Sequence, residues 1–113
     1  MYTYVITLDR VIDGDTIDAM IDLGFDVHVK KRIRFMGINT PESRTRDLEE
    51  KAKGLAAKIR LEELLESKRF LLQSMGVGKF GRCLGIIYVD EVNVNKTLIA
   101  EGHATEYYGG KRW

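Results

Sequence analysis

The sequence predicts an α+β domain, and three features of the chain point to this class. Two stretches near the N-terminus, 2–12 and 16–23, are rich in β-branched and aromatic residues, which is typical of strands. One long segment, 47–67, carries apolar residues at spacings of three and four, which favours a helix. Two further apolar stretches, 70–73 and 83–89, follow this segment and predict more strands.

The N-terminal part predicts three consecutive strands. The first ends at a sharp break, Asp13-Gly14-Asp15, and the second ends where Gly24 turns the chain. Apolar residues between 27 and 35 predict the third strand, with an irregularity around the basic residues 30–32. Strands joined by such short connections predict an antiparallel meander.

The helix predicted over 47–67 carries its own start and stop signals. Asp47 and Glu50 have the spacing of a capping box, and 68–69 supplies two basic residues for the C-terminal end. Gly54 in the middle costs about 1 kcal/mol relative to alanine, which indicates close packing there.

A short second helix is predicted near the C-terminus. Either Asn93 or Asn95 can cap it, and it runs to Glu101, where Gly102 ends it. Five strands, a helix after the third and a short terminal helix fit a five-stranded OB-type β-barrel, although this order also fits other α+β folds.

Length and composition limit the function classes. The 113 residues predict a single domain, 1–113, and 44% hydrophobic residues with 31% charged ones are ordinary for a globular protein. The start of the chain lacks the features of a secretory signal, which favours a cytoplasmic protein, or a secreted one if the chain is an already processed form. Cys83 is the single cysteine, which excludes an internal disulfide and a cysteine-based zinc site. No apolar run has the length of about 20 residues that a membrane helix needs.

The distribution of charge says more than its sum. The formal net charge is only +1, which is weak support for nucleic-acid binding. Basic residues nevertheless cluster near the three motifs described next, while acidic residues gather between 47 and 66.

Three motifs carry the functional signal. They are Asp-Gly-Asp-Thr at 13–16, Asn-Thr-Pro-Glu at 39–42 preceded by Arg34, and Lys-Phe-Gly-Arg at 79–82. Their carboxylates, amide oxygen and arginines could hold a hard cation and clamp a phosphodiester. This set resembles the thermonuclease (staphylococcal nuclease) family, whose calcium-dependent members cut DNA and RNA. The match runs from about Val11 to Tyr108, and it implies the OB-type barrel.

The resemblance implies a metal site formed by Asp15, Asn39 and the backbone carbonyl of Thr40. Asn39 departs from the family, which usually has an aspartate there, so we expect weaker binding of Ca²⁺, with Mg²⁺ or Mn²⁺ as alternatives. An Asx turn leading into Pro41 is another interpretation of Asn39. Asp13 is interpreted either as a turn former or as a partner that orients the ligands.

The resemblance also implies the catalytic groups. Glu42 would orient or deprotonate the attacking water, and Arg34 and Arg82 would stabilise the charge that develops on the phosphate. A glutamate near a helix start is also a favourable N-terminal charge, and most arginines lie on the surface, so these alternatives stay open.

Nucleic-acid contacts are expected from Lys79, Phe80, Tyr107 and Tyr108. Lys79 would meet a terminal phosphate, Phe80 replaces a residue that is often tyrosine, and the tyrosines would stack on a base. Packing at the barrel rim is the alternative for each aromatic residue. His28 and His103 lack metal-ligand spacing and are interpreted as structural or surface residues.

The predicted function is that of a divalent-metal-dependent endonuclease, a phosphodiesterase that hydrolyses DNA, and RNA as a second substrate, with low sequence specificity. Single-stranded substrate should be preferred, and no membrane or protein partner is implied. The alternative is a catalytically weak or inactive OB-fold module that binds nucleic acid, which Asn39 supports. A purely structural domain would leave the clustered arginines unexplained.

Overall fold

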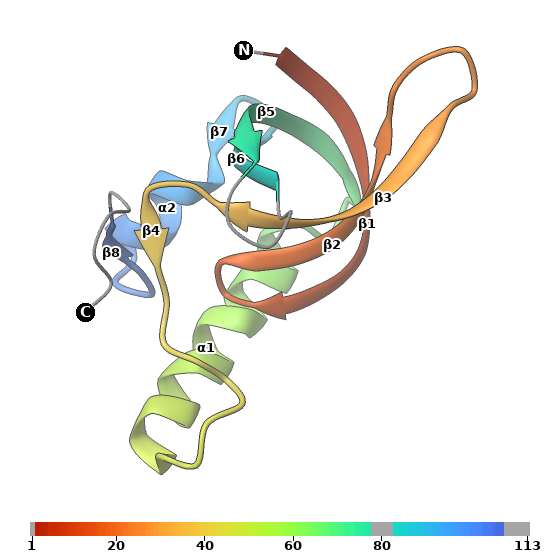
Figure 1. Ribbon diagram of the computed structural model, residues 1–113. Coiled ribbons are helices and arrows are strands. Elements are labelled where there is room, and N and C mark those ends of the chain that lie inside the picture. The colour runs from red at the N-terminus through yellow and green to blue at the C-terminus, as the bar shows by residue number, and fades with distance from the viewer. Residues whose placement is uncertain (1, 78–82, 108–113) are drawn as a thin grey trace.

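Five strands form a closed barrel in the computed structural model, which describes residues 2–77 and 83–107. The barrel strands follow the spatial order β3-β2-β1-β5-β6, and parallel pairing of β3 with β6 closes it (Figure 1). The other neighbours pair antiparallel. The predicted OB-type barrel is therefore confirmed. The strands are β1 (Tyr2–Asp13), β2 (Thr16–Asp22), β3 (His28–Phe35), β5 (Arg69–Val77) and β6 (Cys83–Val89).

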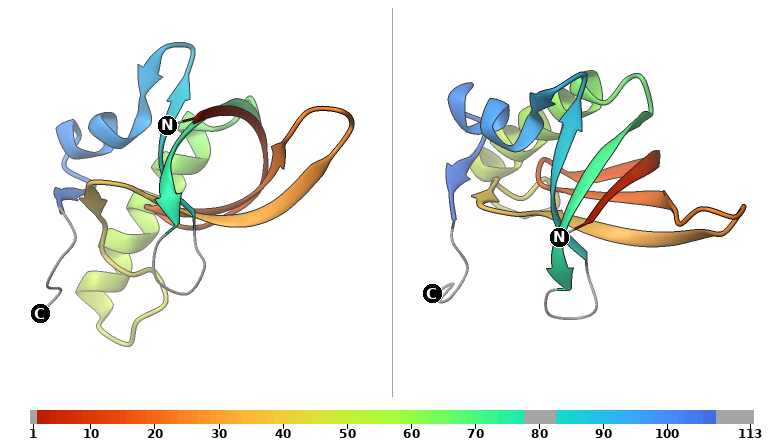
Figure 2. Two further views of the ribbon diagram at one scale, coloured as in Figure 1. Left: turned by 45° about the horizontal axis from the view of Figure 1, so that its top comes forward. Right: turned by 90° about the horizontal axis from the view of Figure 1, so that it is seen from above.

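Two helices and three short strands complete the described part of the chain. The long helix α1 (Leu48–Leu64) follows the third barrel strand, as predicted, and α2 (Val94–Ala100) lies near β6. Figure 2 shows both helices on the same side of the barrel, while the β2–β3 hairpin projects away from it. The short strands have two residues each, too few for an alternating pattern, and the sequence did not predict them. They are β4 (Ile38–Asn39), β7 (Val92–Asn93) and β8 (Thr105–Glu106).

The predicted meander of β1, β2 and β3 is confirmed, but its irregularity lies elsewhere than expected. Strand β3 pairs with β2 in unbroken register through the basic residues 30–32. The register shifts instead within β1, between Leu8 and Arg10 and again between Val11 and Asp13. Bulges bend a strand and increase its twist, and β1 must curve because it pairs with both β2 and β5.

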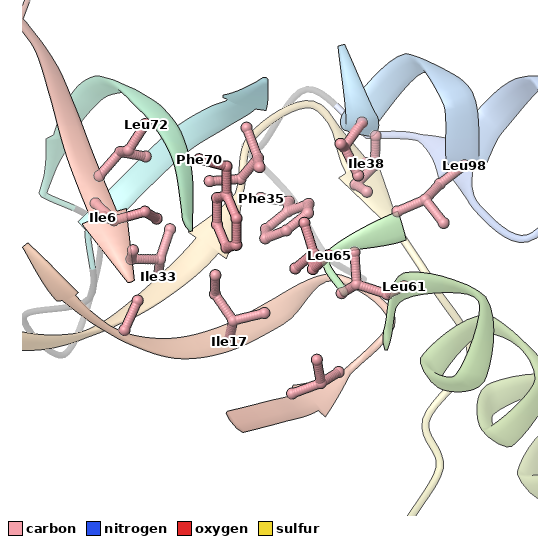
Figure 3. Packing of buried hydrophobic residues seen from close by; sticks show 14 of the residues in the cluster. Ile6, Ile17, Ile33, Phe35, Ile38, Leu61, Leu65, Phe70, Leu72 and Leu98 are labelled. Atoms are coloured by element: carbon pink, nitrogen blue, oxygen red, sulfur yellow. The ribbon is translucent and has the colours of Figure 1, made fainter. Parts of the chain in front are cut away.

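The core fills the barrel and continues beneath α1. Strand residues such as Ile17, Ile33 and Phe35 face inward, and Leu61 and Leu65 close the helix side (Figure 3). Cys83 packs against this cluster as a partly buried residue. Neither described helix has the length and apolarity needed to cross a membrane.

The start of α1 uses half of the predicted capping box. The Asp47 carboxylate accepts hydrogen bonds from the backbone N–H groups of Glu49 and Glu50. The reciprocal partner differs, because the Glu50 carboxylate accepts from the backbone N–H of Glu42 at 3.1 Å. The predicted basic C-terminal end is wrong: the helix ends at Leu64, and Lys68 lies beyond it with φ of +61°.

Helix α1 turns small residues toward the barrel. Its buried residues are Gly54, Ala57 and Leu61. Leu48 and Ile59, two of the apolar residues whose spacing predicted the helix, are instead 79% and 55% exposed. The periodicity therefore predicted the helix correctly but did not identify its packed face. Small side chains there let two loops approach the helix closely, and these loops form the site described below.

Helix α2 is anchored by two asparagines with different roles. Asn93 is the N-cap, and its side chain accepts from the N–H of Lys96 at 3.0 Å. Asn95 is 3% exposed and joins α2 to two other segments: its side chain accepts from the N–H of Ile87 and donates to the carbonyl of Gly85, both on β6, and donates to the carbonyl of Met36. This bridge fixes the segment between β3 and β4.

Candidate active site

Asp15 is the buried acidic group of the site. It lies in the turn between β1 and β2 and is 7% exposed. Its Oδ1 accepts from the Thr16 hydroxyl at 2.9 Å, and its Oδ2 accepts from the Thr40 N–H at 3.0 Å. The Nη1 atom of Arg34 lies 3.3 Å from the same Oδ2. Two sequence motifs 25 residues apart thus meet at one carboxylate.

Arg34 is held on several sides near the end of β3. Its Nη1 donates to the Phe35 carbonyl at 2.9 Å, and its Nη2 donates to Asn39 Oδ1 at 3.4 Å. The guanidinium carbon lies 5.9 Å from the centre of the Tyr107 ring, within the range of a cation–π interaction. These contacts orient the planar guanidinium before any ligand is present.

Pairing between β4 and β8 brings Tyr107 to the site. Ile38 lies opposite Glu106 and Asn39 opposite Thr105, and the N–H of Tyr107 donates to the Gly37 carbonyl at 2.8 Å. Figure 1 shows these two short strands side by side. Two-residue strands leave no pattern in the sequence, so only the resemblance had indicated Tyr107.

Glu42 lies on the loop that runs from β4 to α1. Its side chain is exposed, and its carboxylate accepts no hydrogen bond from residues 2–77 or 83–107. Its backbone, by contrast, is tied to the helix through Glu50. A free carboxylate on an anchored backbone is suited to accept a proton or a hydrogen bond from water.

Asp13 contacts the same loop from the other side. The Ser43 hydroxyl donates to Asp13 Oδ1 at 2.5 Å, and Ser43 is 3% exposed. Arg44 adds a long ion pair to Asp13, with 3.9 Å between Nη2 and Oδ2. Asp13 thus contacts the loop that carries Glu42, at Ser43 and Arg44, and its expected role as a partner that orients the metal ligands stays a prediction. Sequence reasoning missed Ser43, whose only signal was its position next to Glu42.

The oxygen atoms at the site fit a hard cation. Asp15 provides a carboxylate and Asn39 an amide oxygen. Besides the backbone carbonyl expected from the resemblance, Thr40 offers a buried hydroxyl oxygen that has no hydrogen-bond partner among residues 2–77 and 83–107. Over the described ranges, no three or more His, Cys, Asp and Glu residues gather in a way that could hold a metal. Oxygen donors of this kind suit Ca²⁺ and Mg²⁺, whereas structural zinc takes four nitrogen or sulfur ligands.

A neighbouring carboxylate on the barrel wall has a different role. Arg32 donates to Asp18 from β3 and Arg10 donates to it from β1, at 2.8 and 3.1 Å. The hydrogen bond from Arg32 is the main cause that lowers the pKa of Asp18 to about 2, and Arg10 adds to it against the effect of burial. This carboxylate stays charged and paired, so we assign it to the stability of the barrel.

Of the residues predicted for the site, the structure brings together Asp15, Arg34, Asn39, Thr40 and Tyr107. Glu42 follows two residues after Thr40. The remaining predicted residues, Lys79, Phe80, Arg82 and Tyr108, lie outside the described residues.

Comparison with known proteins places the chain in a family. Residues 32–112 match the family model described as staphylococcal nuclease homologue. The chain is 34% identical over 106 residues to Endonuclease YncB of Bacillus subtilis, covering 91% of this chain and 48% of that protein. It is 30% identical over 112 residues to the Micrococcal nuclease of Shigella flexneri, covering 90% of this chain and 58% of that protein. The chain thus spans about half the length of these curated relatives, and it belongs to the staphylococcal nuclease homologue family.

Proposed function

We propose that this protein is a divalent-metal-dependent nuclease that hydrolyses phosphodiester bonds of DNA, and RNA as a second substrate, with little sequence specificity. The observation that carries the proposal is the pair of Arg34 and Asp15, in which a guanidinium suited to bind phosphate lies 3.3 Å from a buried carboxylate. The names of the relatives, an endonuclease and a micrococcal nuclease, support the same reaction class.

Asp15, Asn39 and Thr40 would hold the cation, and Ca²⁺ fits their oxygen donors best. When bound, a divalent cation neutralises phosphate charge and makes a coordinated water more acidic. Asn39 supplies an oxygen without a negative charge, so the affinity should be lower than with an aspartate at this position.

Side chains of the protein would bind the phosphate and activate the attacking water. Arg34 presents two N–H donors that can follow a phosphate as negative charge grows on its oxygens. Glu42 would align the attacking water and accept its proton, which typically contributes about 10²–10⁴-fold to the rate. Arg82 is the second arginine proposed for the phosphate.

Single-stranded nucleic acid is the proposed preferred substrate. The Tyr107 ring lies against Arg34, so a base that stacks on this ring would follow a phosphate bound by the guanidinium. Stacking on an aromatic side chain needs an unstacked base and tolerates any sequence.

The test is cleavage of a labelled single-stranded DNA, its duplex and a matching RNA with Ca²⁺, Mg²⁺, Mn²⁺ or a chelator. The controls are Asp15→Ala and Glu42→Gln, and binding is measured in parallel by fluorescence anisotropy. Metal-dependent cutting that both variants lose would support the proposal. Binding without cutting in every metal would contradict it and leave a nucleic-acid-binding barrel.

A further inference from the structure

The loop that carries Glu42 is fastened on both sides of this residue. Upstream, the N–H of Thr40 donates to Asp15 at 3.0 Å. Downstream, the N–H and the hydroxyl of Ser43 both donate to Asp13 Oδ1, at 3.4 and 2.5 Å. Asp13 ends β1 and Asp15 lies in the β1–β2 turn, with only a glycine between them. This short segment therefore holds the loop at two points, with Glu42 between them.

The loop that carries Glu42 also packs closely against helix α1. A Cβ atom on Gly54 would overlap the carbonyl oxygen of Glu42 and lie 2.6 Å from the backbone nitrogen of Ser43. A Cβ atom on Gly14 would lie 2.7 Å from the Ala57 side chain. The turn, the loop and α1 therefore meet at distances that only glycine permits, which explains the glycine in the middle of a long helix.

We propose that Ser43 and Gly54 are positioning residues for Glu42, which fix its backbone relative to Asp15 through Asp13 and α1. The inference rests on the proposed function, because it assumes that Glu42 acts on the attacking water. The Glu42 side chain itself has no partner in the described parts of the chain, so the location of its carboxylate depends on the backbone. A displacement of about 1 Å in such a group can cost about 10²-fold in rate.

The test begins with Ser43→Ala and its matched control, Ser67→Ala, which makes the same chemical change on an exposed serine just beyond α1. Ser43→Ala should lower kcat about 10- to 100-fold with KM within about twofold of wild type, since substrate contacts are not altered. Ser67→Ala should match wild type. Thermal unfolding of both variants is followed to show that they are folded.

A double variant separates positioning from a general structural role. If Ser43 acts through Glu42, adding Ser43→Ala to Glu42→Gln should change the residual rate by less than about twofold. Full additivity of the two losses would overturn the inference. Asp13→Asn keeps an acceptor oxygen for the Ser43 hydroxyl, so it should retain clearly more activity than Asp13→Ala.

Gly54→Ala tests the helix side. Alanine is a better helix former than glycine, so if the substitution affected only the helix, kcat should stay at the wild-type value. If the added Cβ atom displaces the loop that carries Glu42, kcat should fall about tenfold or more. Wild-type kcat in both Ser43→Ala and Gly54→Ala would overturn the inference while leaving the nuclease proposal standing. A wild-type protein that binds but does not cut nucleic acid would overturn the proposed function, and with it the positioning role of Ser43 and Gly54.

Discussion

The Nη1 atom of Arg34 lies 3.3 Å from Oδ2 of Asp15, and the two side chains are only 14% and 10% exposed. The residue proposed to bind phosphate is therefore the direct neighbour of the residue proposed to bind the cation. Each charge stabilises the other in the absence of ligand, and removing one would leave the other buried without compensation. A cation at Asp15 and a phosphate at Arg34 would provide the same compensation.

Arg34→Lys should lower kcat/KM about 10²-fold. Lysine keeps the positive charge beside Asp15 but loses the planar pair of donors that can follow a phosphate oxygen. Steady-state cleavage of single-stranded DNA measures the loss. Arg10→Lys, the same change at an arginine that is 64% exposed on the barrel wall, is the control. Equal rates for Arg34→Lys and wild type would refute a bidentate role.

Asn39→Asp should tighten divalent-cation binding about tenfold or more, because a second carboxylate would join Asp15. It should also strengthen the contact with Arg34, which now donates to the amide oxygen of Asn39 at 3.4 Å. Calorimetric titration with Ca²⁺ measures the affinity. Asn93→Asp adds the same charge at the cap of α2, away from the site, and should leave the affinity unchanged.

Much of the fold could be predicted because its signals are local. β-branched runs, the 13–15 break and the Asp47 cap each depend on neighbouring residues, and all three appear in the structure. The packed face of α1 could not be predicted in this way. The packed face is set by the close approach of neighbouring backbone at Gly54 and Ala57. Larger apolar side chains on other faces of the helix, such as Leu48, therefore stay exposed.

The site residues could likewise be predicted only where their signals are local. Asp15, Asn39 and Thr40 were found because they lie in short motifs that resemble the family. The contacts that orient them are long-range: Ser43 reaches Asp13 across 30 residues, and Thr105 pairs with Asn39 across 66. Such contacts depend on how the barrel closes, and neither composition nor spacing contains that information.

Asp18→Asn should lower the free energy of unfolding at pH 7 by about 1–2 kcal/mol, allowing for the partial exposure of both arginines. The pKa of Asp18 is lowered from 3.8 to about 2, so its ion pairs stabilise the fold above about pH 4. This contribution is lost as the pH falls toward 2, and the wild type and variant should then converge. Urea unfolding between pH 2 and pH 7 measures the difference. Asp26→Asn, the same change on the exposed hairpin tip, is the control.

Asn95→Ala should lower the free energy of unfolding by about 2–4 kcal/mol. It removes three hydrogen bonds and leaves the N–H of Ile87 and the carbonyls of Met36 and Gly85 without this partner. Asn93→Ala, two residues earlier, removes only the helix cap and should cost about 1 kcal/mol. Urea denaturation at pH 7 compares the two variants, and equal losses would contradict the bridging role of Asn95. Because Met36 precedes the strand that carries Asn39, the variant Asn95→Ala should also weaken Ca²⁺ binding, whereas Asn93→Ala should not.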